Sequence, residues 1–142
     1  MIRRFSAGLA LLATLTGHAD AQDAKKTKEI ANNFSHQNLI CSSYYYFVGQ
    51  CLEKADPKDR LVKQYRTGAE TFLQRGIDMA RVAGVSDKAI NAKMELAIED
   101  MKSETDNDCV NIAVLLKKHA KTCKSTMDDG PAILLEQYKA AR

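Results

Sequence analysis

Two cysteines enclose an aromatic segment in the stretch Cys41-Ser42-Ser43-Tyr44-Tyr45-Tyr46-Phe47-Val48-Gly49-Gln50-Cys51. The fold can be inferred by starting from this stretch. Apolar side chains before and within it recur at three- and four-residue steps, which is typical of one face of an α-helix. We therefore predict a helix from about Asp23 to Lys54, with Ser35 either capping a new helix or lying inside a long one. The stripe consists of Ile30, Phe34, Cys41, Tyr44, Tyr45, Val48, Cys51 and Leu52.

Residues 1–21 have the pattern of a secretory signal peptide that is cleaved from the mature chain. Basic residues Arg3 and Arg4 precede a short apolar run, and Ala19-Asp20-Ala21 matches an Ala-x-Ala cleavage signal. The run is shorter than the roughly 20 residues of a membrane span, so no stable membrane anchor is expected. We predict a periplasmic or secreted protein with a single helical domain over residues 22–142, in which residues 22–34 are a candidate for fraying.

Charge argues against nucleic acid as a partner. The chain of 142 residues has 21 basic and 18 acidic side chains. Removing Arg3, Arg4 and Asp20 with the signal peptide leaves 19 and 17, a net charge of +2. No basic block or acidic tail stands out, so no binding to nucleic acid is expected.

Four further helices follow the first. Asp56 and Pro57 are the predicted N-cap and first residue of a helix that ends near Ala83, with Gly84 as its C-cap. Ser86 caps the next helix, over about 87–103. A helix from Cys109 to Cys123, a loop over 126–130 and a short helix from Pro131 complete the chain. The inward residues are predicted as Ile90, Met94, Ala97, Ile98 and Met101 in the third helix, and as Cys109, Ile112, Ala113, Leu116, Ala120 and Cys123 in the fourth.

Two glycines lie on the apolar stripe of the second helix. Gly68 and Gly76 flank Phe72 at helical spacing. Glycine inside a helix costs about 0.5–1 kcal/mol relative to alanine, so a close approach of another helix or a large side chain is expected there. A hinge is the alternative.

The four cysteines predict two disulfides, because an even number in a small exported chain is typical of a disulfide framework. On a helix, Cys41 and Cys51 are about 15 Å apart and Cys109 and Cys123 about 21 Å. A disulfide holds its Cα atoms roughly 4.4–6.8 Å apart. Each cysteine must therefore pair with one from the other stretch.

The order of the helices favours one connectivity. Short turns favour an up-down-up-down bundle, which makes the first and fourth helices antiparallel. The preferred pairs are then Cys41 with Cys123 and Cys51 with Cys109, although the two spans differ by about 6 Å. The parallel pairs, Cys41 with Cys109 and Cys51 with Cys123, would need the fourth helix reversed. The predicted fold class is an all-α, disulfide-stapled antiparallel bundle of four main helices plus a short C-terminal helix.

Motifs for chemistry are absent from the sequence. It has no Cys-x-x-Cys, Gly-rich phosphate loop, Gly-x-Ser-x-Gly or His-Glu-x-x-His pattern. Four cysteines could hold zinc if both pairs converged, but an oxidising compartment favours disulfides. His36 and His119 are expected at the surface, because two histidines without a third ligand do not define a metal site. No catalytic residue, metal or cofactor is predicted.

The aromatic residues Tyr44, Tyr45, Tyr46 and Phe47 are the candidate binding face. They spread over about 300° of a helix, so they cannot all enter one core. Tyr44 and Tyr45 suit the cysteine stripe, and Tyr46 or Phe47 must then face another helix or solvent. Contacts inside the monomer are one interpretation, and a protein-binding face is the other.

The spacing of Cys41 and Cys51 is similar to the twin Cys-x9-Cys hairpins of the mitochondrial intermembrane space, but the second spacing has thirteen intervening residues, so no function is carried over. The whole chain resembles small uncharacterised exported helical proteins of Gram-negative bacteria, which implies no mechanism.

We expect a non-catalytic module that binds another periplasmic or secreted protein. The alternatives are a carrier of a small ligand in an apolar cavity between helices, and an enzyme without a recognisable motif. Oligomeric state is left open.

Overall fold

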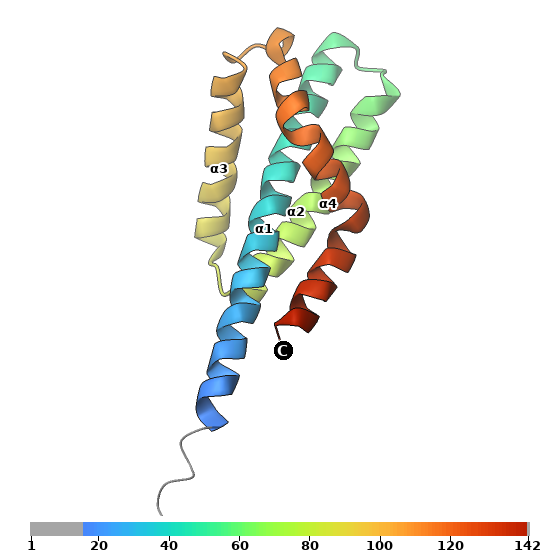
Figure 1. Ribbon diagram of the computed structural model, residues 1–142. Helices are drawn as coiled ribbons and strands as arrows, with labels where there is room; N and C mark the ends of the chain where they lie inside the picture. The colour runs from blue at the N-terminus through green and yellow to red at the C-terminus, as the bar shows by residue number, and fades with distance from the viewer. Residues whose placement is uncertain (1–15, 142) are drawn as a thin grey trace, which may run out of the picture.

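The chain folds into an antiparallel bundle of α-helices, which the computed structural model describes from Thr16 to Ala141 (Figure 1). The helices are α1 (Thr16–Ala55), α2 (Arg60–Val82), α3 (Asp87–Glu104) and α4 (Ala113–Ala140), and the short 3₁₀ helix η1 (Cys109–Asn111) precedes α4. Within this range there is no strand, and the predicted all-α bundle is confirmed. Residues 1–15 of the predicted signal peptide lie outside the described residues, so its cleavage stays a prediction.

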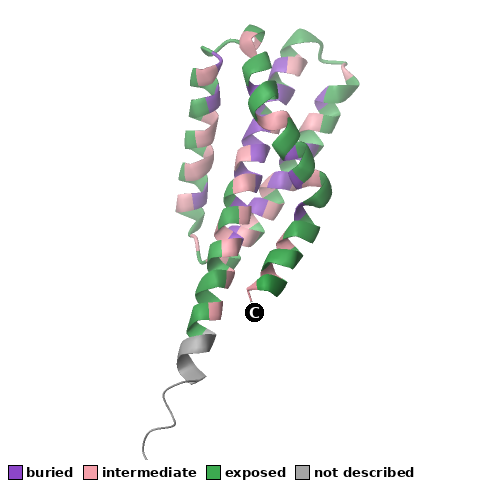
Figure 2. Ribbon diagram, viewed as in Figure 1, coloured by how far each residue is buried: buried purple, intermediate pink, exposed green. Residues whose placement is uncertain are grey.

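Helix α1 is the central element of the bundle. It runs unbroken through Ser35, which is buried inside it and caps no second helix. Figure 2 shows the buried residues concentrated where α1 meets the other helices. The main core contains Cys41, Tyr44, Phe47, Val48, Cys51, Phe72, Met101, Leu115 and Cys123.

Small residues let α2 approach α1 closely. A Cβ atom added to Gly76 would lie 2.8 Å from Cδ2 of Leu39, and one added to Gly68 would lie 2.6 Å from Cε1 of Tyr45. Both distances are shorter than carbon atoms can approach. The two glycines therefore mark places where large side chains of α1 lie against the α2 backbone, as their position on the stripe predicts.

Two buried serines join the same pair of helices. Ser35 Oγ donates a hydrogen bond to the Gly76 carbonyl at 2.8 Å, and Ser42 Oγ donates to the Ala69 carbonyl at 2.9 Å. Each pair is seven residues from the next on both helices, which is two helical turns. Hydroxyls that bind carbonyls of the neighbouring helix fix the register between α1 and α2.

Helix α2 begins three residues later than the predicted start at Pro57. Asp59, not Asp56, is its N-cap, and Asp59 Oδ1 accepts a hydrogen bond from Leu61 N at 2.8 Å. Asp56 Oδ1 instead accepts from Lys58 N in the turn before the helix. At the other end Gly84 has φ of 79°, the left-handed conformation that suits glycine just after a helix. Ser86 caps α3 as predicted.

Helix α4 corrects the prediction of a loop over 126–130 and a separate final helix. It continues through Pro131 to Ala140, and it bends near its middle (Figure 1). Proline lacks the N–H that would bind the carbonyl four residues earlier, which is that of Met127. Arg75 Nη1 from α2 donates to this carbonyl at 3.3 Å. The lost bond is thereby replaced, and the helix does not end.

The disulfides join α1 to the segment from η1 to α4. Cys41 is bonded to Cys123 and Cys51 to Cys109, with Cα atoms 5.4 Å apart in each case. This is the antiparallel connectivity. The cysteine spans 41–51 and 109–123 would differ in length by about 6 Å if both were straight helices. Cys109 lies in η1 and not in α4, so α4 does not have to bend to bring both cysteine pairs together.

The buried face of α4 also differs from the predicted stripe. Leu115 is fully buried, whereas Leu116 is 38% exposed. The face continues through His119, Cys123 and Thr126, at three- and four-residue steps. His119 and Thr126 are polar and do not add to the apolar pattern of this face. The pattern therefore selected Leu116 as an inward residue instead of Leu115.

Candidate functional site

Helix α3 is held at its two ends and borders open space in its middle. Ile90 near one end and Met101 near the other are its two buried residues. Between them Met94, Ala97 and Ile98 are half-buried, although all three were predicted to face inward. Helix α3 lies at the edge of the bundle (Figure 1). A groove lies along each side of it, one toward α2 and one toward α4.

The first groove, here called the Tyr46 groove, lies between α1, α2 and α3. Its volume is about 580 Å³. Tyr46 is 48% exposed at its edge, and Gln50 Nε2 donates a hydrogen bond of 2.7 Å to the Tyr46 hydroxyl. The lining residues are Ser42, Ser43, Tyr46, Arg66, Ala69, Glu70, Leu73, Met94 and Ile98. The groove therefore combines aliphatic walls, an exposed tyrosine and one charge of each sign.

The second groove, here called the histidine groove, lies between α1, α3 and α4 and has a volume of about 400 Å³. It brings together His36 and His119, which are far apart in the sequence. Its lining is completed by Ile40, Lys93, Leu96, Ala97, Asp100, Met101, Glu104 and Lys118. Aliphatic side chains are thus surrounded by two basic and two acidic residues.

Polar contacts of the histidine groove tie α3 to its neighbours. Lys93 Nζ donates to Asn32 Oδ1 at 3.2 Å, which links α3 to α1. Lys118 Nζ and Glu104 Oε1 are 2.6 Å apart, which links α4 to α3. Both lysines are already paired. An acidic ligand in this groove would therefore have to displace Asn32 or Glu104 from them.

His119, which was predicted at the surface, is half-buried and lines this groove. Its ring lies 5.7 Å from that of Tyr44, measured between centroids. Its Nε2 is buried and has no hydrogen-bond partner in the described part of the chain. Burial and the charge of Lys118 lower the pKa of His119, while Glu104 opposes this shift. The neutral form of this imidazole is therefore favoured. His36 is exposed.

A third groove, the disulfide groove, lies between α1, α2 and the start of α4, and has a volume of about 460 Å³. Both Cys51 and Cys109 line it. No charged residue is among the others, which are Val48, Leu52, Ala55, Leu61, Tyr65, Val110, Ile112 and Leu116. The disulfide is therefore part of an open apolar surface.

The predicted aromatic binding face is divided by the fold. Tyr44 and Phe47 are 1% and 8% exposed and belong to the core, so they cannot meet a partner. Tyr45 is half-buried, with its ring 4.9 Å from that of Tyr65 and 5.2 Å from that of Phe72. Of the four aromatic side chains, Tyr46 alone is exposed.

The described residues also bear on metal binding, membrane insertion and cellular compartment. No group of three His, Cys, Asp or Glu side chains there could hold a metal ion. No helix of this part is long and apolar enough to cross a membrane. Two disulfides indicate an oxidising compartment outside the cytoplasm.

Comparison with protein-family models, with curated proteins and with solved structures finds no match for this chain. The sequence predicted that Tyr46 or Phe47 faces another helix or solvent. No pattern in the sequence indicated the grooves, because their width depends on how far apart the helices stand.

Proposed function

We propose that the protein is a non-catalytic module of the periplasm or the extracellular space, and that it binds another protein through the Tyr46 groove. The observation that carries this proposal is the half-exposed Tyr46 at the edge of an apolar groove. Tyrosine is common at the centre of protein interfaces, because it supplies a large contact area and a polar tip at a small entropy cost.

The surroundings of Tyr46 support a preformed contact surface. The α1–α2 pair beneath it is fixed by buried serine hydrogen bonds. The wall formed by α3 carries Met94 and Ile98, and methionine adapts easily to different apolar shapes. Glu70 at the groove can accept hydrogen bonds from a partner, whereas Arg66 already pairs with Glu53. The fitting partner presents an apolar side chain flanked by polar ones.

A crosslinking experiment tests this proposal. A photoactivatable amino acid at position 46 is expected to form a specific adduct in the cell envelope, which mass spectrometry identifies. The same probe at Leu135, which is 54% exposed on α4, is the matched control. With the purified partner, Tyr46→Ala should weaken binding by about tenfold or more. No adduct at position 46, or the same adducts at both positions, would contradict the proposal.

The histidine groove favours a second candidate function, a carrier of a small amphipathic ligand. Its volume of about 400 Å³ lies within the range of roughly 300–1,000 Å³ typical of ligand sites. Aliphatic residues beside Lys93 and Lys118 would suit a ligand with an apolar body and an acidic group. Native mass spectrometry of the purified protein should then show a bound small molecule, which Ala97→Trp displaces while Tyr46→Ala does not.

A further inference from the structure

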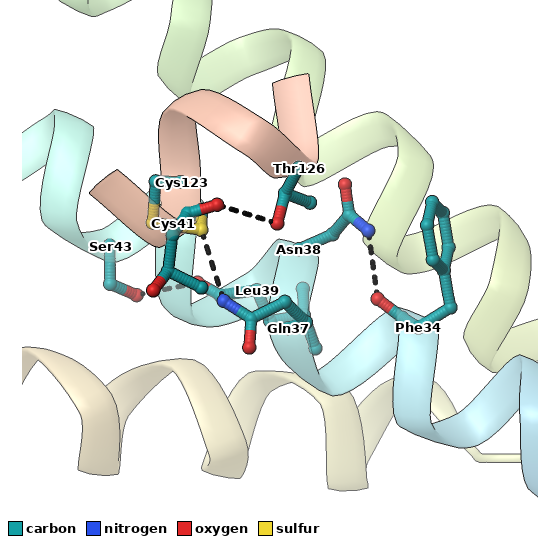
Figure 3. Close-up of a disulfide and its surroundings, with 9 residues drawn as sticks. Phe34, Gln37, Asn38, Leu39, Cys41, Ser43, Cys123 and Thr126 are labelled. Atoms are coloured by element: carbon teal, nitrogen blue, oxygen red, sulfur yellow. Dashed lines mark hydrogen bonds between the residues drawn. A yellow bond between two sulfur atoms is a disulfide. The ribbon is translucent and has the colours of Figure 1, made fainter. Parts of the chain in front are cut away.

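The two disulfides differ in their access to solvent. Cys41 and Cys123 are both 0% exposed. Figure 3 shows this bond enclosed by side chains of α1 and α4, where Gln37 Nε2 donates to Cys41 Sγ at 3.4 Å. In contrast Cys109 is half-buried, and both Cys51 and Cys109 line the disulfide groove. A reagent in solution can therefore reach one bond without unfolding and not the other.

The surroundings of Cys109 make this access easy. Cys109 begins the three-residue helix η1, and the next residue, Val110, is 85% exposed. No residue of η1 is buried. The groove volume of about 460 Å³ exceeds that of a small thiol reagent. The Cys109 sulfur can thus be approached along the groove while α1 stays in place.

We propose that Cys51–Cys109 is a thiol–disulfide exchange site for a small dithiol, while Cys41–Cys123 is a permanent structural bond. The thiolate of the dithiol attacks Sγ of Cys109, forms a mixed disulfide and releases Cys51 as a thiolate, which takes a proton from water. The second thiolate of the reagent then attacks its own sulfur in the mixed disulfide and releases Cys109, which is also protonated. The reagent loses two electrons and becomes a disulfide, and each cysteine gains one electron and one proton.

Opening this bond has a local consequence. The Cys41–Cys123 bond still joins the middle of α4 to α1, so α4 remains attached. The segment from Thr105 to the first turn of α4 loses its covalent tie, and this segment carries one wall of the disulfide groove. Reduction therefore frees one wall of this apolar groove in a molecule that is otherwise folded.

Timed reduction of the native full chain tests the proposal. The protein is treated with dithiothreitol under native conditions, free thiols are blocked with N-ethylmaleimide at intervals, and peptides are mapped by mass spectrometry. Cys51 and Cys109 should be labelled at least about tenfold faster than Cys41 and Cys123, because exchange rates depend on access. In strong denaturant the two pairs should react at similar rates. Equal native rates, or faster labelling of Cys41 and Cys123, would overturn the proposal.

A monothiol probe tests the direction of attack. Native protein treated with 2-mercaptoethanol should carry the mixed disulfide on Cys109 and a free thiol at Cys51. Far-UV circular dichroism of the singly reduced protein should retain most of the helix signal. An adduct on Cys51, or loss of the helix signal once this bond alone is open, would contradict the proposed step.

Discussion

Helices α2 and α3 both pack against α1, and they do so in opposite ways. Against α2 the packing uses Gly68 and Gly76, whose missing side chains let the helices touch, and buried serine hydroxyls bind the α2 backbone. Against α3 the packing depends on Ile90 and Met101 near its ends, and its middle borders two grooves. The close contact of α1 with Gly68 and Gly76 of α2 leaves no room for a ligand. The looser contact of α1 with α3 leaves two grooves in which a ligand or partner can bind.

This contrast also separates the stability of the two helices. Regions with few buried apolar contacts open at a lower free-energy cost than the core of the same domain. We infer that α3 opens as a separate unit, whereas α1 and α2 open only when the whole protein unfolds.

Reduction of both disulfides should have the largest effect. The chain-entropy model assigns each bond about 4 kcal/mol as an upper estimate. We expect the Tm to fall by about 10 °C or more when both bonds are reduced. Neither bond joins α1 to α2. Limited proteolysis of the reduced protein should therefore cut within residues 87–140 before it cuts within residues 31–80. Early cleavage in α2 would show that its packing depends on the disulfides.

Filling the space at a glycine should affect α2 far more than filling a groove affects α3. Gly76→Leu places a side chain where Leu39 already lies, and we expect a loss of about 3 kcal/mol in the free energy of unfolding. Ala97→Leu, which adds three carbon atoms on the wall of the histidine groove instead of four, should change it by less than about 0.5 kcal/mol. Urea unfolding measures both. Similar losses would mean that α3 is packed as closely as α2.

Loss of a serine hydroxyl between α1 and α2 should have a moderate effect. Ser42→Ala removes the hydrogen bond to the Ala69 carbonyl, which should lower the free energy of unfolding by about 1 kcal/mol. Ser103→Ala on the exposed side of α3 is the control and should have little effect. If the two variants unfold at the same urea concentration, the hydroxyl does not stabilise the pair.

The pH dependence associated with His119 should be the smallest effect. Because burial and Lys118 lower its pKa in the folded state, the unfolded chain binds this proton more readily. Stability from the neutral imidazole is fully present above the unfolded value of about 6.5, and it is lost as the pH falls through the lower folded value. His119→Leu should therefore show a smaller decrease in Tm between pH 7 and pH 5 than the wild type. An unchanged slope would show that His119 does not contribute.

Much of the fold followed from the sequence, because local rules govern it. Helical periodicity predicted the four main helices, and the distance along a helix excluded a bond from Cys41 to Cys51. The place of Gly68 and Gly76 on a stripe predicted a close approach. The predicted helix break before Pro131 was wrong, because the carbonyl that proline frees is bound by Arg75, a residue of another helix. No local pattern contains that contact.

The candidate site followed from the sequence only in part. The 100° between successive residues of a helix required Tyr46 or Phe47 to face another helix or solvent, and Tyr46 is the one that faces solvent. The partial burial of His119 was missed because a polar residue does not add to an apolar pattern. The grooves beside α3 were missed because periodicity gives the face of a helix and not its distance from the next one.

Hydrogen–deuterium exchange of the native protein tests the central claim most directly. It measures the opening free energy of each helix in one experiment, without a variant. The amides of Asp87–Glu104 should exchange through an opening that costs at least about 2 kcal/mol less than the opening of the α2 amides. Equal opening free energies for α3 and α2 would instead show that α3 belongs to the same cooperative unit as α1 and α2.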